Sequence, residues 1–141
     1  MTDGDRAGVV LVVEDQPANF LLARASLERC GYSVVGAGDA DEARRWLDSE
    51  RPDLILMDVG LPGQDGLSFT RELKSNIETA RIPIVALTAH AMKSDEARAR
   101  AAGCDGYISK PFSPRHLGNL VVGLLSESRQ PDSRNEATRD S

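Results

Sequence analysis

The chain has few of the residues that build metal or disulfide frameworks. It contains two cysteines and two histidines among 141 residues, and neither type occurs in pairs at the spacing of a zinc site. Cys30 and Cys104 each stand beside a glycine at a predicted helix end, and we expect both to be reduced structural thiols. A zinc domain and a disulfide-stapled secreted fold are therefore disfavoured.

The chain also lacks long apolar runs, a basic cluster and an apolar N-terminal leader. Its apolar runs are far too short to cross a bilayer, and its acidic first five residues do not resemble a secretory signal. We therefore expect a cytoplasmic protein that does not enter membranes. Its net charge is −5, so direct binding to nucleic-acid phosphates is not expected.

Short apolar runs suited to strands alternate with segments whose apolar residues recur at helical spacing. This alternation predicts an α/β fold with a doubly wound, five-stranded parallel sheet. The predicted strands are 9–13, 33–35, 54–57, a fourth that begins at Ile82, and 107–109. The predicted helices are 17–30, one after Asp39, one that holds Leu67, Phe69 and Leu73, 95–102, and one from Pro114 to Leu124.

Several predicted helix ends carry residues that are typical of caps. Gly31 follows the first helix and favours a left-handed stop. Asp39 and Glu42 have the form of a capping box, and Ser113 followed by Pro114 matches an N-cap with proline at the first helical position. These residues place the boundaries of three helices.

The predicted helices differ in their apolar faces. The first should turn Phe20, Leu27 and the neighbouring aliphatic residues inward. Helix 95–102 is rich in alanine and arginine and has only a weak apolar stripe, so we expect shallow packing and mobility there.

The length and the distribution of apolar residues indicate a single folded domain. We expect it to span 9–125, between a disordered N-terminal segment, 1–8, and a disordered C-terminal tail, 126–141. The tail is almost entirely charged and polar. No output domain is expected, so the predicted protein is of a stand-alone type.

Polar residues follow four of the five predicted strands. Glu14 and Asp15 follow the first, Asp58 the third, Thr88 the fourth and Lys110 the fifth. Open parallel sheets bind ligands beyond the carboxyl ends of their strands, so these five side chains can converge. Each pair of carboxylates about 5 Å apart repels by about 3 kcal/mol at an effective dielectric constant near ~20. A divalent cation would relieve this repulsion.

Magnesium fits such a site because it prefers oxygen ligands and keeps several waters. Asp15 and Asp58 would bind the ion directly and Glu14 through water, while Lys110 and Thr88 would bind phosphoryl oxygens. Asp58 would then be the nucleophile of a phosphoryl transfer. Each residue alone has a simpler interpretation, as an acidic helix cap, a turn hydroxyl or a surface charge, and only their shared placement favours a site.

Motifs around these residues match a known family in order and spacing. They are Val-Val-Glu14-Asp15, Leu-Met-Asp58 followed by Leu61-Pro62-Gly63 and Asp65-Gly66, Leu-Thr88-Ala89, and Gly106-Tyr107-Ile-Ser-Lys110-Pro111-Phe112. From about Val9 to Leu125 the chain resembles the receiver domain of response regulators. The resemblance implies a flavodoxin-like fold with strand order 2-1-3-4-5.

The resemblance also implies residue roles. Asp58 would accept a phosphoryl group from a histidine kinase or phosphotransferase, with Mg2+ held by Asp15, Asp58 and the Gly60 carbonyl, assisted by Glu14. The implied phosphoryl-binding residues are Thr88, Ala89 and Lys110. Thr88 and Tyr107 would form a switch that reshapes the face of the fourth helix, fifth strand and fifth helix for a downstream target. Lys110–Pro111 would be a cis peptide.

The predicted function is therefore a phosphorylation-activated switch, a monomer or a phosphorylation-linked dimer, that catalyses only its own phosphorylation and dephosphorylation. Two alternatives remain at this stage. One is a binding module that works without phosphorylation. The other is an aspartate-nucleophile phosphohydrolase, which usually has a second aspartate where this chain has Gly60. The missing side chain at Gly60, whose expected partner across the site is His90, should also alter the dephosphorylation kinetics, and both His90 and His116 are expected on the surface.

Overall fold

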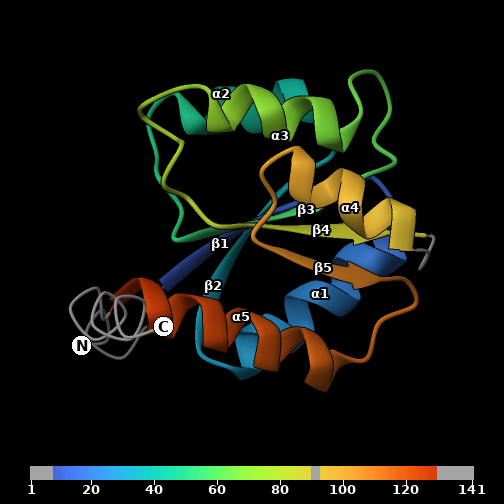
Figure 1. Cartoon of the computed structure of the whole chain (residues 1–141). Coiled ribbons are helices and arrows are strands. Elements are labelled where there is room, and N and C mark those ends of the chain that lie inside the picture. Colours follow the sequence, from blue (N-terminus) through green and yellow to red (C-terminus); the bar gives the residue numbers. More distant parts are fainter. Residues whose placement is uncertain (1–7, 90–92, 130–141) are drawn as a thin grey trace, which may run out of the picture.

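The computed structural model of the protein describes residues 8–89 and 93–129. Strands and helices alternate strictly along these residues, as the sequence predicted (Figure 1). The elements are β1 (Gly8–Val13), α1 (Pro17–Arg29), β2 (Tyr32–Ala37), α2 (Ala40–Leu47), β3 (Leu54–Asp58), α3 (Gly66–Lys74), β4 (Ile84–Thr88), α4 (Lys93–Ala101), β5 (Gly106–Ser109) and α5 (Pro114–Arg129).

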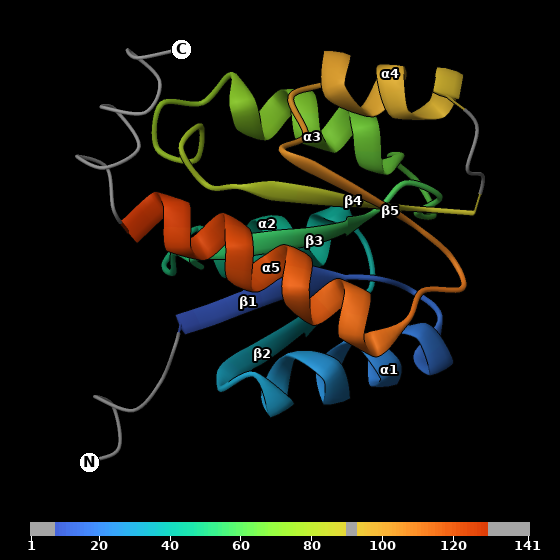
Figure 2. The same cartoon turned by 60° about the horizontal axis from the view of Figure 1, so that its bottom comes forward.

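The five strands form one parallel sheet in the order β2-β1-β3-β4-β5, which confirms the predicted topology. Helices α2, α3 and α4 cover one face and α1 and α5 the other (Figures 1 and 2). The neighbouring strands β1 and β3 are followed by helices on opposite faces, α1 on one face and α3 on the other, so the connections that leave these two strands diverge. Ligands bind beyond the carboxyl ends of strands at such a point.

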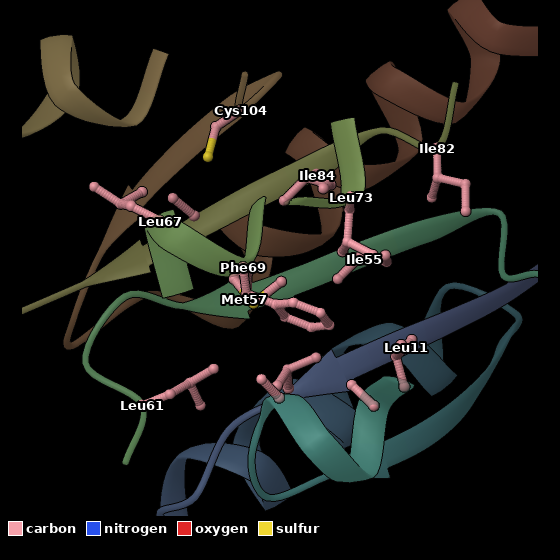
Figure 3. Packing of buried hydrophobic residues seen from close by; sticks show 14 of the residues in the cluster. Leu11, Ile55, Met57, Leu61, Leu67, Phe69, Leu73, Ile82, Ile84 and Cys104 are labelled. Atoms are coloured by element: carbon pink, nitrogen blue, oxygen red, sulfur yellow. The ribbon is translucent and has the colours of Figure 1, made fainter. Parts of the chain in front are cut away.

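Both faces of the sheet are covered, and the central strands are accordingly apolar up to the polar residues that end β3 and β4. Alternate residues of each strand enter two separate cores. Leu11, Ile55 and Met57 pack under α2 and α3, together with Phe69 of α3 (Figure 3). Their neighbours, such as Leu56, face α1 and α5. The sheet is therefore held firmly from both sides, which gives its strand ends a rigid base.

Three predicted helix boundaries are confirmed by local contacts. Gly31 has a φ of 97° after α1. The Asp39 carboxylate accepts a hydrogen bond from the Glu42 amide at 2.8 Å, and Glu42 accepts one from the Gly38 amide at 2.7 Å. The Ser113 hydroxyl accepts a bond from the amide at the start of α5.

Several predicted boundaries differ from the structure. β4 begins at Ile84 rather than Ile82, because the Ile82 amide closes a turn onto the Thr79 carbonyl at 3.1 Å. β2 is longer than 33–35, and α4 lies at Lys93–Ala101. α5 continues to Arg129, beyond the predicted domain end at 125. The remainder of the predicted tail, the segment 1–7 and His90 lie outside the described residues.

Helix α1 shows an error in the predicted inward face. Leu27 is buried as expected, but Leu21 and Leu22 are 58% and 37% exposed. With Ala23 and Leu27 against the sheet, the 100° step of the helix carries Leu21 and Leu22 toward the outer side. Their aliphatic character alone did not decide which of them are buried.

Other predictions can be compared directly with the structure. Ala99 is the one buried residue of α4, as expected for shallow packing, and His116 is exposed. Both cysteines are free, Cys104 being buried and Cys30 exposed. Within 8–89 and 93–129, no helix has the length and apolar character needed to span a bilayer.

A glycine at the start of α3 should be essential for the fold. A Cβ on Gly66 would lie 2.1 Å from the Asp58 carbonyl oxygen, a backbone atom that cannot move aside. We expect Gly66→Ala to lower the free energy of unfolding by about 3 kcal/mol, the upper range for overpacking. Gly123→Ala is the matched control. A Cβ there meets nothing within 4 Å, so this helical substitution should stabilise by about 0.5–1 kcal/mol. Urea titration of both variants measures the two effects, and equal stability would contradict the close approach at Gly66.

Candidate functional site

The carboxyl ends of four strands meet around one cavity. Glu14 and Asp15 directly follow β1, which pairs with β3 so that Val13 lies beside Met57, the residue before Asp58. Thr88 ends β4. The cavity, of about 290 Å³, is lined by Asp15, Gln16, Asp58, Val59, Gly60, Thr88, Ala89 and Lys110. The structure therefore brings together the predicted site residues, except that Glu14, Tyr107 and Pro111 do not line the cavity.

Three carboxylates form the acidic part of the site. One oxygen from each of Glu14, Asp15 and Asp58 lies within 4.8 Å of the other two. Glu14 and Asp58 are buried and Asp15 is exposed. This donor set of hard oxygens, with one ligand open to solvent, suits a magnesium ion that retains several waters.

The Lys110 ammonium group lies between two of these carboxylates. Its Nζ is 3.1 Å from Glu14 Oε1 and 3.1 Å from Asp58 Oδ1. Burial lowers the pKa of Lys110, but the hydrogen bond to Asp58 and the negative charges of Asp58 and Glu14 together raise it above its usual value. The amine therefore stays protonated at neutral pH and offsets part of the acidic charge.

Glu14 is the most buried of the acids, with a side chain that is 0% exposed. Its Oε2 accepts a hydrogen bond from the Gln16 amide at 3.0 Å. Its Oε1 is ion-paired with Lys110 but has no hydrogen-bond partner among the described residues. Burial raises the pKa of Glu14 and the Asp58 charge adds to this, while the Gln16 amide and Lys110 lower it. The unsatisfied Oε1 is an acceptor suited to a metal-bound water.

The Asp58 carboxylate is held through a single oxygen. Oδ1 accepts hydrogen bonds from the Gly60 amide at 3.0 Å and from Lys110. Among the described residues, no hydrogen bond to the second oxygen, Oδ2, is found. One oxygen of the carboxylate is thus fixed, and the other is available to a metal or an incoming group.

Thr88 and Tyr107 connect the cavity with the surface near α4. Thr88 is buried and Tyr107 is half-buried, and the Thr88 side chain is close enough to Tyr107 to influence its pKa. Burial raises the pKa of Tyr107, as do the charges of Asp95 and Glu96 on α4, while the Thr88 side chain lowers it. The Lys110–Pro111 peptide is cis, as expected.

Two residues that line the cavity, Gln16 and Val59, were not predicted as site residues. Gln16 lines the cavity and is the N-cap residue of α1. Its backbone amide binds Glu14, and its side-chain Nε2 lies 3.4 Å from Asp15 Oδ2. The position of Gln16 between the acid pair and Pro17 was the available indication, since the residue before a helix-starting proline occupies the N-cap position.

The family model of the response regulator receiver domain matches residues 10–122. The chain belongs to this family, whose members are phosphorylated in two-component signalling and bind Mg2+ in the active site.

Individual relatives agree with this assignment. The polar-differentiation response regulator DivK of Brucella anthropi is 46% identical over 119 residues, which are 84% of this chain and 97% of that protein. DivK of Brucella ovis is 45% identical over 119 residues with the same coverage.

Solved structures show the same fold. The receiver domain of a sensor histidine kinase from Pseudomonas aeruginosa, described with a magnesium ion coordinated in the active site cleft, is 37% identical. The two structures superpose with a TM-score of 0.77 over 84% of this chain and 98% of that one. A response regulator from Chloroflexus aurantiacus is 30% identical, with a TM-score of 0.81 over 84% of this chain and 98% of that one.

Proposed function

We propose that this protein is a signalling switch that accepts a phosphoryl group on Asp58 in the presence of Mg2+. The observation that carries the proposal is the convergence of Glu14, Asp15 and Asp58 within 4.8 Å, beside a lysine ammonium, at one cavity. This is the arrangement needed to position and neutralise a phosphoryl group.

The proposed reaction forms a bond between an Asp58 oxygen and phosphorus while the bond from phosphorus to the donor breaks. The donor is a phosphohistidine of a kinase or phosphotransferase, and its imidazole leaves with the bonding electron pair. Asp15, Asp58 and the Gly60 carbonyl would hold Mg2+, with Glu14 acting through water. The bound ion would neutralise the charge of the phosphoryl oxygens.

Other residues of the cavity would bind the transferred group. Lys110 would move its ammonium from Asp58 to a phosphoryl oxygen, which keeps the positive charge at the site where negative charge develops. The Thr88 hydroxyl and the Ala89 amide would bind further oxygens. No residue other than Asp58 would form a covalent bond.

The output of the switch would be a change in protein binding. The Thr88 side chain influences the pKa of Tyr107, so drawing Thr88 toward a phosphoryl group would also alter the Tyr107 environment. Tyr107 would then reshape the face formed by α4, β5 and α5, where a downstream target binds. We place this switch in the cytoplasm, where it would act as a monomer or a phosphorylation-linked dimer.

The intact mass of the protein after incubation with acetyl phosphate, with and without Mg2+, tests this proposal. We expect a gain of one phosphoryl group that requires Mg2+. If acetyl phosphate leaves the protein unmodified, the protein is next incubated with a phosphorylated histidine phosphotransferase as the donor. Absence of labelling by both donors would contradict the proposed function and favour a phosphorylation-independent binding module.

Gly60 should influence how long the phosphoryl group lasts. A Cβ on Gly60 would have only Asp58 Oδ1 nearby, at 3.9 Å, so a larger side chain fits without strain. We expect Gly60→Asn to shield the phosphoryl group from water and to lengthen its lifetime several-fold. The decay of labelled protein, followed by intact mass, measures this. Decay at the wild-type rate would show that this position does not control water access.

A further inference from the structure

A polar network joins α2, the β3–α3 loop and α3 on the outer surface. It centres on Arg44 of α2, and we call it the Arg44 network. Its members are Asp41, Arg44, Gln64, Ser68 and Glu72.

Arg44 is held in one orientation by several partners. Its Nε and Nη2 donate to the two Glu72 oxygens at 2.6 and 2.9 Å, and its Nη1 donates to Asp41 at 2.7 Å. Its guanidinium also lies 5.0 Å from the centre of the Phe69 ring, a residue anchored in the core (Figure 3). A planar group with a bidentate partner and a stacked ring has little freedom to reorient.

Gln64 attaches the β3–α3 loop to this fixed group. Its Oε1 accepts a hydrogen bond from Arg44 Nη2, and its Nε2 donates to Ser68 Oγ at 3.1 Å and to Glu72 Oε1 at 3.2 Å. Both ends of the Gln64 amide are therefore bound. In the described part of the chain, no other side-chain hydrogen bond links residues 60–65 to α2.

The loop has little other support on this side. A hollow of about 160 Å³, lined by Asp39, Ala40 and Asp41 and by Pro62, Gly63 and Gln64, separates the start of α2 from the loop. Leu61 anchors the loop in the core beneath (Figure 3). Between Leu61 and the helix cap at Asp65, Gln64 is the residue whose side chain is hydrogen-bonded both to α2 and to α3.

The Arg44 network contributes little to the overall stability of the fold. Arg44 and Glu72 are 37% and 42% exposed, and ion pairs at that exposure contribute little to the free energy of unfolding. The loop that the network restrains includes Gly60, which lines the cavity beside Asp58. Local order of this loop is therefore the more direct consequence.

We propose that Arg44 and Gln64 are positioning residues that hold the β3–α3 loop, and with it the Gly60 carbonyl, in the geometry that Mg2+ requires. The inference rests on the proposed function. Mg2+ demands nearly ideal octahedral coordination, so a carbonyl that is free to move is a poorer ligand. Residues that orient ligands from outside the coordination sphere can change metal affinity by about 10- to 100-fold.

Gln64→Ala tests the inference without changing the charge of the protein. We expect the Mg2+ dissociation constant, measured by calorimetric titration of the full chain, to rise about 10-fold. The amides of residues 61–65 should exchange hydrogen faster. Labelling by a phosphodonor should be slow at low Mg2+ and return to the wild-type rate at saturating Mg2+, a recovery that general damage to the fold would not allow.

Two further variants separate positioning from charge. Arg44→Lys keeps the charge but loses the bidentate fork, so it should weaken Mg2+ binding in the same direction. Arg51→Ala is the matched control, since Arg51 forms a comparable exposed ion pair with Glu78 at 2.9 Å without touching the loop. Arg51→Ala should leave Mg2+ affinity unchanged, and a 10-fold loss there would overturn the positioning role.

The outcomes for the two proposals are distinguishable. Wild-type protein that binds Mg2+ together with a Gln64→Ala variant of equal affinity would overturn the inference and leave the proposed function intact. Wild-type protein that does not bind Mg2+ at all would overturn both.

Discussion

Asp58→Asn is expected to abolish phosphorylation completely. The amide has the shape of the carboxylate, and its oxygen can still accept the Gly60 hydrogen bond seen at 3.0 Å, but it is not a nucleophile toward phosphorus. Intact mass after incubation with a phosphodonor and Mg2+ should show no gain. The Tm should stay close to that of the wild type, because removing one of three crowded carboxylates relieves repulsion.

Asp58→Ala provides an independent check because alanine cannot deamidate back to aspartate. It should also remain unlabelled and folded, as judged by circular dichroism. Stoichiometric labelling of either variant would mean that another residue is the acceptor, and peptide mapping would then locate it.

Lys110→Met is expected to slow phosphorylation and to destabilise the metal-free protein. The substitution keeps the aliphatic stem but removes the cation that lies 3.1 Å from both Glu14 and Asp58. Loss of one group that stabilises developing charge lowers rates by about 100-fold or more. Because Glu14 is left charged, buried and without a cation, we also expect a loss of about 3 kcal/mol in unfolding free energy at pH 7.

The pH dependence of this loss has a definite sign. Burial already raises the pKa of Glu14 above its ordinary value of 4.5, and removing Lys110 raises it further. At a pH between 4.5 and the raised pKa of the folded protein, Glu14 binds a proton in the folded protein but not in the unfolded chain. The free energy of unfolding therefore falls as the pH rises through this range. The deficit of Lys110→Met should be largest at neutral pH and should shrink as pH falls toward 4.5. Urea unfolding in EDTA at several pH values measures it.

Lys74→Met is a suitable control for Lys110→Met. The Lys74 ammonium is also partly buried and binds Asp105 at 3.0 Å and the carbonyls of Ala80 and Ile82, but none of these residues lines the cavity. It should lower stability and leave the phosphorylation rate unchanged. Equal slowing in both variants would assign the effect of Lys110 to stability alone.

Much of the acidic site could be predicted because it depends on local pattern. Asp58 ends a run of four apolar residues, and Glu14 and Asp15 end another. In a parallel sheet with both faces covered, such runs form strands, and their carboxyl ends lie at the same edge. No knowledge of side-chain packing is needed to place these three acids together.

The predictions that failed have separate physical causes. Leu21 and Leu22 are as apolar as Leu27, but only the orientation of α1 on the sheet decides that they are exposed. The start of β4 is set by the turn that the Ile82 amide closes. The continuation of α5 to Arg129 could not be predicted, because the residues after Leu125 are strongly polar and the apolar periodicity of the helix ends before them.

Residue order alone thus settles the alternation of strands and helices, the parallel sheet and the edge at which its acids gather. These features follow from backbone hydrogen bonding and from burial periods of two and 3.6 residues, which are properties of short segments. Only the tertiary structure decides that Lys110 reaches between Glu14 and Asp58, or that Arg44 binds Gln64. Such contacts join residues 20 to 96 positions apart, and their distances depend on how whole elements pack rather than on any local pattern.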